Sequence, residues 1–197
     1  MGLKLSKRLA TIAKFVSEGV FFADIGTDHA YLPCYICMHD LKARAIAGEV
    51  REGPLERARQ TVQAYKLEDR IQIRLGNGLS VIGNDTVTEV VIAGMGGLLI
   101  SNILEEGKQY LKHVDKLILQ PNVGEYHVRK WLFDHQFKII DERLIQDGEH
   151  FYEVIVAQKL NQKSISTKIT EKELLFGPCL LLNKHKLFYK KWRSRYD

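Results

Sequence analysis

The sequence predicts an α/β fold: a doubly wound, mostly parallel seven-stranded sheet that ends in an antiparallel hairpin. Two observations lead to this prediction. Short apolar runs rich in β-branched residues alternate with helical patterns up to about residue 135, as in a parallel sheet with right-handed crossovers. The last two strands then follow one another without a helix, and residues 146–149, Gln-Asp-Gly-Glu, contain the Asp-Gly pair that favours a hairpin turn.

The strands are expected at residues 20–25, 44–49, 71–75, 89–93, 116–120, 137–144 and 151–158, and the helices between them at 30–41, 52–67, 98–111 and 125–135. In the second of these helices, Leu55, Ala58, Val62 and Tyr65 recur at the spacing of one apolar face. Residues 89–93 form a nearly continuous apolar run, which is typical of a parallel strand covered on both faces.

The composition changes at about Asn161, where a polar, loop-like segment begins. Two helices are expected after it, at 170–176 and 179–195, separated by Gly177-Pro178. The chain is therefore expected to consist of a domain at residues 1–160, which includes an N-terminal basic helix, and a helical C-terminal part at 161–197.

The composition is that of a soluble globular protein, with 45% apolar and 27% charged residues. No apolar run approaches the roughly 20 residues that a membrane-spanning helix requires. The N-terminus lacks the apolar core and cleavage site of a signal peptide. We therefore expect a cytoplasmic protein, and a monomer.

Basic residues give the chain a net charge of +5 and gather at its two ends. Those near the N-terminus are Lys4, Lys7, Arg8 and Lys14, and those near the C-terminus are Lys184, Lys186, Lys190, Lys191, Arg193 and Arg195. Two solvated helix faces explain this distribution as well as a surface that binds nucleic acid does.

Three cysteines, Cys34, Cys37 and Cys179, do not make a disulfide framework. Cys34 and Cys37 have the C-x-x-C spacing, but zinc requires about four ligands and the sequence has no second cysteine pair. Both lie in the apolar stretch at residues 30–38, so we expect two buried helix cysteines that act as small apolar side chains.

The loop after the first expected strand carries two carboxylates. In open α/β sheets a ligand lies beyond the carboxyl ends of the strands, so the residues directly after each strand are the candidates for binding it. Gly26 lets the backbone pass close to a ligand. The Gly-x-Gly-x-x-Gly pattern is absent, and the carboxylates oppose the pyrophosphate of a dinucleotide but suit a sulfonium cofactor with an amino group. The loop, which contains Asp24, Gly26, Thr27, Asp28 and His29, therefore favours S-adenosylmethionine over NAD.

The next two strand ends fit the same cofactor. Glu49 ends the second strand, at the spacing from Asp24 where an acidic side chain accepts hydrogen bonds from both ribose hydroxyls. An exposed glutamate without a ligand is the alternative. Asn77 and Gly78 follow the third strand, where Asn77 suits the adenine edge and the glycine admits the ring. A plain Asn-Gly turn explains this pair almost as well.

The fourth and fifth strand ends complete the candidate site. Residues 94–97, Gly-Met-Gly-Gly, follow a buried strand, where three glycines cost backbone entropy. We interpret Gly94 and Met95 as part of the cofactor site, with a tight strand–helix turn as the alternative. The Asn/Asp-Pro-Pro-Tyr motif of many amino-methyltransferases is absent. Gln120-Pro121-Asn122 after the fifth strand places a rigid turn and an amide beside the same cleft.

Four motifs occur in a fixed order: Asp-Ile-Gly-Thr-Asp-His-Ala-Tyr-Leu-Pro at 24–33, Ala-Gly-Met-Gly-Gly at 93–97, Leu-Gln-Pro-Asn at 119–122 and Leu-Leu-Phe-Gly-Pro at 174–178. Together they resemble the bacterial tRNA (adenine-N1)-methyltransferase family that modifies position 22, and the resemblance runs from Leu5 to about Trp192. It implies a Rossmann-like class I methyltransferase domain followed by a helical, coiled-coil-like domain. The second long helix is shorter here than in that family, which predicts a truncated or reduced C-terminal domain.

The resemblance also implies methyl transfer from S-adenosylmethionine to N1 of an adenine in tRNA, without a metal. N1 has a lone pair and no proton, so orientation rather than a strong base is required. Asp28 and Asn122 are suited to accept hydrogen bonds from the exocyclic amine, and Asp28 also to stabilise the cationic product. His29 either contacts the base or is a buried structural histidine.

Because N1 lies on the pairing edge, the adenine must leave its stack before it reacts. An RNA substrate favours the interpretation that the basic residues at the chain ends contact phosphates. We therefore expect Lys4, Lys7, Arg8 and Lys14 to bind tRNA.

Three other functions compete with this interpretation. A methyltransferase acting on a small molecule or a protein differs only in its substrate. A dinucleotide-dependent oxidoreductase is opposed by the acidic first loop. A tRNA-binding module without activity is opposed by the presence of Asp24, Gly26 and Glu49 together.

Overall fold

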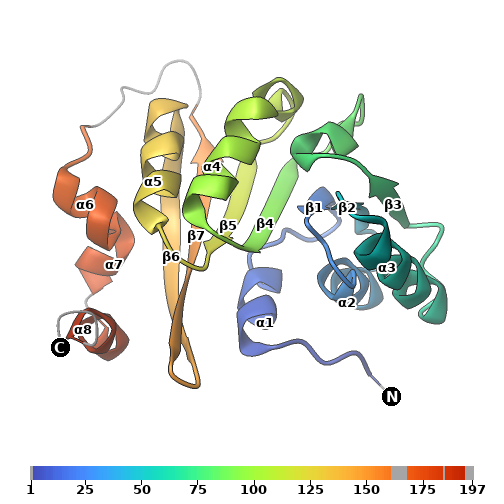
Figure 1. Cartoon of the computed structure of the whole chain (residues 1–197), viewed down its shortest axis with the longest axis horizontal. Helices are drawn as coiled ribbons and strands as arrows, with labels where there is room; N and C mark the ends of the chain where they lie inside the picture. Colours follow the sequence, from blue (N-terminus) through green and yellow to red (C-terminus); the bar gives the residue numbers. More distant parts are fainter. Residues whose placement is uncertain (1, 161–167, 184, 194–197) are drawn as a thin grey trace.

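Seven strands form one sheet, in the order β3-β2-β1-β4-β5-β7-β6 (Figure 1). The computed structural model describes residues 2–160, 168–183 and 185–193. The polar loop expected near 161–167, Lys184 and Arg195 lie outside these residues. The strands are β1 (Phe21–Ile25), β2 (Arg44–Glu49), β3 (Ile71–Leu75), β4 (Glu89–Met95), β5 (Lys116–Pro121), β6 (Phe137–Asp147) and β7 (His150–Lys159).

The pairings confirm the expected fold class. The first five strands pair in parallel, and β7 is antiparallel to both β5 and β6. Residues 147–150 join β6 and β7, as the Asp-Gly signal predicts. The helices are α1 (Lys7–Ala13), α2 (Tyr31–His39), α3 (Glu52–Ala64), α4 (Gly97–Glu106), α5 (Glu125–Asp134), α6 (Glu171–Phe176), α7 (Pro178–Asn183) and α8 (Lys186–Arg193), with short 3-10 helices η1 (Gly78–Ile82) and η2 (Lys108–Leu111).

Each face of the sheet has its own apolar core. Ile12 of α1, Ile36 of α2 and Val62 of α3 are buried against one face. Ile100 of α4 and Leu132 of α5 are buried against the other. Because β1 and β4 are covered on both sides, their sequences are nearly continuous apolar runs rather than alternating ones.

Two expected helices are shorter than the sequence pattern indicates. The helix expected at 98–111 ends at Glu106, and a 3-10 turn follows Gly107. A Cβ on Gly107 would lie 2.5 Å from the Cβ of Leu79, so the chain turns where only glycine fits against η1. The helix expected at 52–67 ends at Ala64, and Lys66 has a φ of 56° that no α-helix tolerates.

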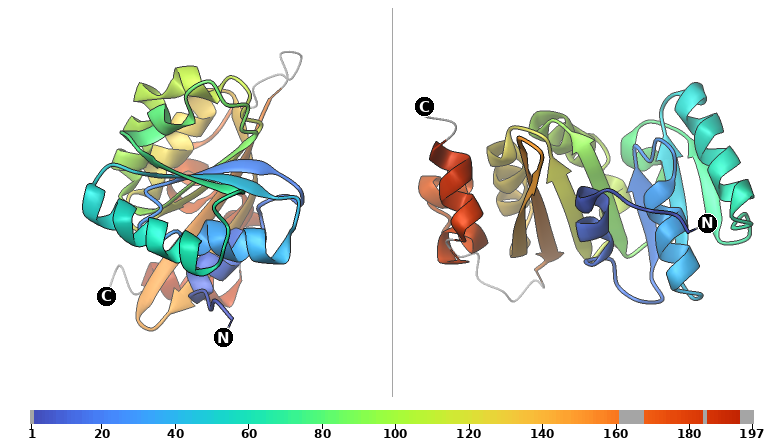
Figure 2. Two further views of the ribbon diagram at one scale, coloured as in Figure 1. Left: turned by 90° about the vertical axis from the view of Figure 1, so that its right-hand side faces the viewer. Right: turned by 90° about the horizontal axis from the view of Figure 1, so that it is seen from below.

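The single helix expected at 179–195 is wrong: within the described residues this segment forms two helices, α7 and α8. The three C-terminal helices pack beside α5 and the β6 edge (Figures 1 and 2). The two helices contact different carboxylates of the sheet, and one continuous helix would not make both sets of polar contacts.

A buried ionic network holds the C-terminal helices. Arg129 of α5 is fully buried and forms ion pairs with Glu142 of β6, at 2.8 Å, and with Glu153 of β7. Its Nη1 also donates to the carbonyl oxygens of Leu174 and Leu175, at 3.2 and 3.3 Å, near the end of α6.

The same carboxylates reach the other two helices. Glu142 Oε2 accepts hydrogen bonds from the backbone N–H groups of Cys179 and Leu180 at the start of α7. Lys191 of α8 is buried, with its Nζ 2.5 Å from both Glu125 and Glu153. The sequence pattern therefore misplaced Lys191 among surface cations, because its charge is compensated inside the fold.

Cys34 and Cys37 are buried in α2, as expected, and burial raises the pKa of their thiols to about 12 and about 11. No helix among the described residues is long and apolar enough to cross a membrane.

Arg129→Met is expected to lower the free energy of unfolding by about 3–5 kcal/mol, because it leaves Glu142 and Glu153 buried without their cation. The matched control is Arg143→Ala, which removes a cation of β6 from a partly exposed ion pair with Asp141 and should cost less than about 1 kcal/mol. Urea unfolding measures both variants. Equal losses would show that the buried network does not stabilise the fold.

Candidate functional site

A cavity of about 640 Å³ opens at the carboxyl ends of β1, β2 and β4, where the strand order reverses. Helix α1 lies over this edge of the sheet, between the β6–β7 hairpin and α2 (Figure 2). The expected site residues that line the cavity are Arg8, Asp24, Gly26, Thr27, Asp28, His29, Glu49, Asn77, Gly78, Gly94 and Met95. Asn122, Lys4, Lys7 and Lys14 do not line it.

Asp24 is the next-to-last residue of β1 and is buried in the wall of the cavity. Its carboxylate accepts a hydrogen bond from Thr27 Oγ1 at 2.7 Å. Burial raises the pKa of Asp24 to about 6; the Thr27 hydrogen bond lowers it, and the nearby Glu49 carboxylate raises it further. The backbone N–H groups of Gly26 and Thr27 both donate to Gly48 O, so the first loop is fixed to β2.

Glu49 ends β2 and is also buried. Its Oε1 accepts hydrogen bonds from the backbone N–H groups of Val50 and Arg51, at 3.0 and 3.2 Å. These bonds fix the carboxylate at the wall of the cavity, so the alternative of an exposed strand-end glutamate is wrong. Two carboxylates held side by side make this part of the cavity acidic and favour a ligand with positive charge.

The segment between β1 and α2 has an unusual backbone. Asp28 and Ala30 have φ values of 53° and 56°, in the left-handed region that ordinary residues rarely adopt. Such strain is concentrated at binding and catalytic sites. It turns Asp28 outward, where its side chain is 60% exposed and lies 3.6 Å from Arg57 and 3.7 Å from His29.

His29 is partly exposed at the cavity and stacks on Tyr31, with ring centroids 5.0 Å apart and planes 7° apart. The alternative of a buried structural histidine is therefore wrong. Two further side chains line the cavity without having been predicted from the sequence: Tyr31, from the same motif, and Leu99, which is exposed in the first turn of α4.

The glycines after β4 have separate structural reasons. Gly94, with a φ of 78°, is the extra residue of a bulge in the pairing with β5. A Cβ on Gly94 would lie 3.0 Å from Arg8 Nη1, and one on Gly97 would lie 2.0 Å from Gly124 O. Gly97 thus fits the alternative of a tight turn, whereas Gly94 borders the cavity. Gly78 likewise combines a positive φ with a place in the cavity wall.

Asn122 is exposed and does not line the cavity. Its Nδ2 donates to Gly94 O at 2.9 Å, and its Oδ1 accepts a hydrogen bond from Gln120 Nε2 at 3.2 Å. Gln120 is fully buried and bonds Arg8 and the Gly94 N–H as well. The sequence shows this amide only as part of a turn motif, and its contact with α1 joins residues 112 positions apart.

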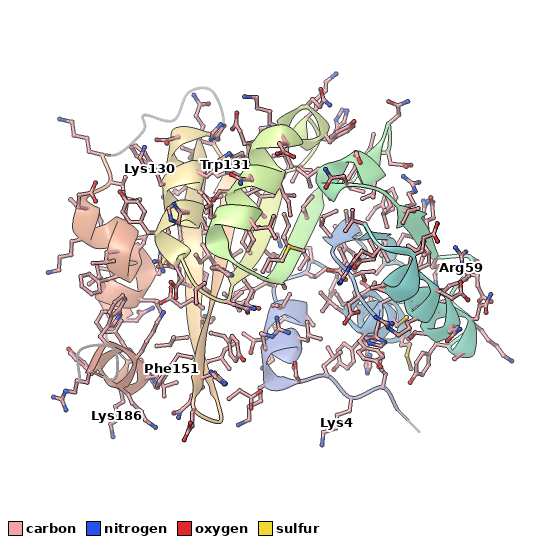
Figure 3. The ribbon with its side chains drawn as sticks, in the orientation of Figure 1. Lys4, Arg59, Lys130, Trp131, Phe151 and Lys186 are labelled. Carbon is pink, nitrogen blue, oxygen red and sulfur yellow. The ribbon has the colours of Figure 1, made fainter. Side chains whose placement is uncertain are left out.

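The basic residues expected to bind tRNA lie in different parts of the structure. Arg8 lines the cavity and packs against Tyr152, with its Cζ 5.6 Å from the ring centroid. Lys4 precedes α1 and is exposed, at the same end of the molecule as Lys186 and the hairpin near Phe151 (Figure 3). Lys7 is exposed in α1, and Lys14, at the C-terminus of α1, borders a different hollow beside α2.

Known proteins resemble this chain over nearly its whole length. A profile of the family described as TrmK, tRNA (adenine(22)-N(1))-methyltransferase, matches residues 22–197. The Bacillus subtilis (strain 168) tRNA (adenine(22)-N(1))-methyltransferase is 42% identical over 191 residues, which are 96% of this chain and 80% of that protein.

Solved structures agree with this match. A Streptococcus pneumoniae protein in complex with S-adenosyl-L-methionine superposes with a TM-score of 0.91 at 42% identity, over 98% of this chain and 88% of that one. M. capricolum TrmK in complex with S-adenosyl-homocysteine has a TM-score of 0.86 at 31% identity, over 97% of this chain and 83% of that one.

Asp24→Asn is expected to flatten the pH dependence of the unfolding free energy. The pKa of Asp24 in the folded protein, about 6, lies above its ordinary value of 3.8. Asp24 therefore contributes stability that is fully present below about pH 4 and is lost as the pH rises through about 6. The loss amounts to about 2–3 kcal/mol. Urea unfolding between pH 4 and 8 measures it, and parallel curves for both proteins would contradict the raised pKa.

Proposed function

The chain belongs to the TrmK family of tRNA (adenine(22)-N(1))-methyltransferases, and we propose that its carboxyl-edge cavity binds S-adenosylmethionine and methylates N1 of adenine 22 in tRNA. The observation that carries this assignment is the pair of buried carboxylates, Asp24 and Glu49, in one cavity at the reversal of strand order. The cavity volume of about 640 Å³ is within the usual range for a small-molecule site.

The cavity residues fit the parts of this cofactor. Glu49, fixed by two backbone N–H groups, is placed to accept hydrogen bonds from the ribose hydroxyls. Asp24 suits the cofactor's amino group, because a cation offsets the cost of ionising a buried carboxyl. Asn77 and Gly78 border the cavity where the adenine ring would lie. Gly26, Thr27, Gly94 and Met95 form the wall between these ends.

When bound, S-adenosylmethionine supplies an electrophilic methyl group. The protein then has to hold the N1 lone pair in line with that group and exclude other orientations, which is catalysis by positioning. Asp28 and His29 lie at the cavity and are partly exposed, so both are available to an entering base. We assign to Asp28 the hydrogen bond from the exocyclic amine and the stabilisation of the cationic product.

We propose a different role for Asn122 from the one expected. Its amide is bonded to Gly94 O and Gln120, and it does not line the cavity. We therefore assign it to holding the Gly94 bulge in place, rather than to contact with the target adenine.

The tRNA contacts proposed for Lys4 and Lys7 follow from their exposure beside the cavity edge. Lys14 borders another hollow, which does not support its assignment to tRNA.

We place the domain boundary near residue 160. The described helices at 171–193 dock on α5 and β6 through the ionic network, which supports a C-terminal part that packs against the catalytic domain. Because tRNA is the substrate, we place the protein in the cytoplasm.

The experiment that tests this function uses labelled S-adenosylmethionine and an unmodified tRNA transcript. We expect close to one methyl group per tRNA, recovered as 1-methyladenosine by nucleoside analysis. The matched control is the same transcript with guanine at position 22, which should accept none. Equal labelling of both transcripts, or labelling of protein alone, would contradict the proposal and favour another substrate.

Asp28→Ala and Glu49→Ala are expected to separate catalysis from cofactor binding. Glu49→Ala should weaken the binding of S-adenosylhomocysteine by about 1–3 kcal/mol, because the ribose hydroxyls lose a charged acceptor. Asp28→Ala should lower kcat at saturating cofactor and leave that affinity nearly unchanged. Calorimetric titration and single-turnover methylation measure the two effects. Unchanged affinity in Glu49→Ala, or a large loss of affinity in Asp28→Ala, would reverse the assignments.

A further inference from the structure

The side-chain amide of Gln120 is fully buried at the end of β5, behind the cavity. Its Oε1 accepts hydrogen bonds from Arg8 Nη1 at 2.5 Å and from the Gly94 N–H at 3.0 Å. Its Nε2 donates to Pro121 O at 2.9 Å and to Asn122 Oδ1 at 3.2 Å. An amide has two acceptor sites and two N–H donors, so these four bonds use its full capacity and fix its orientation.

One pair of these bonds shapes the cavity wall. Gly94 is the bulged residue of β4, and its N–H and C=O are bonded to Gln120 and Asn122 respectively. A bulge leaves backbone groups without a partner in the strand pairing. The two amides satisfy both groups and hold the bulge against the cavity.

The bond to Arg8 joins α1 to the sheet. Helix α1 has only seven residues, too few to be stable by itself, so its position depends on tertiary contacts. Arg8 lies in the cavity wall, beside Gly94 and against the ring of Tyr152. Gln120 therefore fixes the guanidinium at the mouth of the cavity.

The amide of Gln120 carries no charge, and this matters for Arg8 as much as the position of the amide does. Within residues 2–160, 168–183 and 185–193, no carboxylate oxygen lies within 4 Å of the Arg8 guanidinium, and its hydrogen-bond partner is a neutral amide. Gln120 thus orients Arg8 without neutralising its charge. A guanidinium held in this way is ready for a bidentate contact with an anion, and phosphate has the matching geometry.

We propose that Gln120 is a positioning residue for methyl transfer: it holds Arg8 so that the guanidinium binds the phosphate group of the target nucleotide and sets the depth to which the base enters the cavity. This inference rests on the proposed function, since it takes the acceptor to be a nucleotide in RNA. Gln120 itself touches neither substrate nor cofactor; it acts through Arg8.

The test is a double-mutant cycle with Gln120→Glu and Arg8→Ala. Gln120→Glu keeps the size of the side chain but neutralises Arg8 and repels Pro121 O and Asn122 Oδ1. Each single variant should lower kcat/KM for the tRNA transcript about 10–100-fold, the effect of losing a charged hydrogen bond. Each should also reduce the salt dependence of tRNA binding by about one phosphate contact. Affinity for S-adenosylhomocysteine should stay within about twofold.

The double variant decides the mechanism. If Gln120 acts through Arg8, the combined variant is no slower than the slower single variant. Effects on kcat/KM that multiply would overturn the proposal, because Gln120 would then support only the Gly94 bulge. Unchanged kcat/KM in Gln120→Glu would overturn it too.

Two controls keep the result interpretable. Arg44→Ala removes a cation at the amino end of β2, where Arg44 stacks on Phe21, and should leave kcat/KM and the salt slope unchanged. If Gln120→Glu fails to fold, Arg8→Gln tests the same contact from the partly exposed helix, and normal kcat/KM in that variant overturns the inference.

Failure of this inference can be distinguished from failure of the proposed function. A wild-type protein that leaves adenine 22 unmethylated overturns both. If the wild-type protein methylates adenine 22 and the variants do so equally fast, only this inference is overturned.

Discussion

The reversal of strand order at β1 is the constraint on which the position of the candidate cofactor site depends. β1 pairs with β2 on one side and with β4 on the other, and the helices that follow cover opposite faces of the sheet. The loops after β1 and β4 therefore diverge and leave a cavity between them. The parallel register of β1 and β2 ends their strands together, which brings Asp24 and Glu49 to the same wall. A different strand order with the same loop sequences would not bring these carboxylates together.

This arrangement trades stability for binding. Burial removes hydration from the Asp24 carboxylate and the nearby Glu49 carboxylate repels it, and the raised pKa of Asp24 is the result. The left-handed backbone of Asp28 and Ala30 adds strain to the same loop. Neither feature helps the empty protein to fold. The cationic cofactor proposed for this cavity would relieve the repulsion between the carboxylates. The site is thus prepared for its ligand at a cost that the apolar cores on the two faces of the sheet offset.

The opposite edge of the sheet carries charge for a structural purpose. There Arg129 and Lys191 compensate Glu142 and Glu153 in the interior, and the surrounding hydrogen bonds connect β6 and β7 to the three C-terminal helices. These partners come from distant parts of the chain, so the network specifies where the helices dock rather than simply adding stability. The hairpin whose tip reaches the end of the molecule near Phe151 is held by the same contacts (Figure 3). The basic residues of α8 are therefore of two kinds: Lys191 is buried, whereas Lys186 and Lys190 are exposed.

The sequence by itself determined the fold class, the order of the strands along the chain and half of the residues that line the cavity. It did so because strand periodicity is local, and because ligand-binding residues in a parallel sheet follow the strand ends. Tertiary structure alone decided three matters. It showed that the Asn122 amide bonds Gly94 and Gln120, that Lys191 is inside the fold, and that Gln120 joins α1 to β5. Each depends on contacts between residues far apart in sequence, and local patterns of polarity do not encode which buried amide or cation meets which partner. The division of this segment into two helices has the same cause, since separate carboxylates on the sheet, Glu142 for α7 and Glu153 for α8, rather than helix propensity, fix where each helix lies.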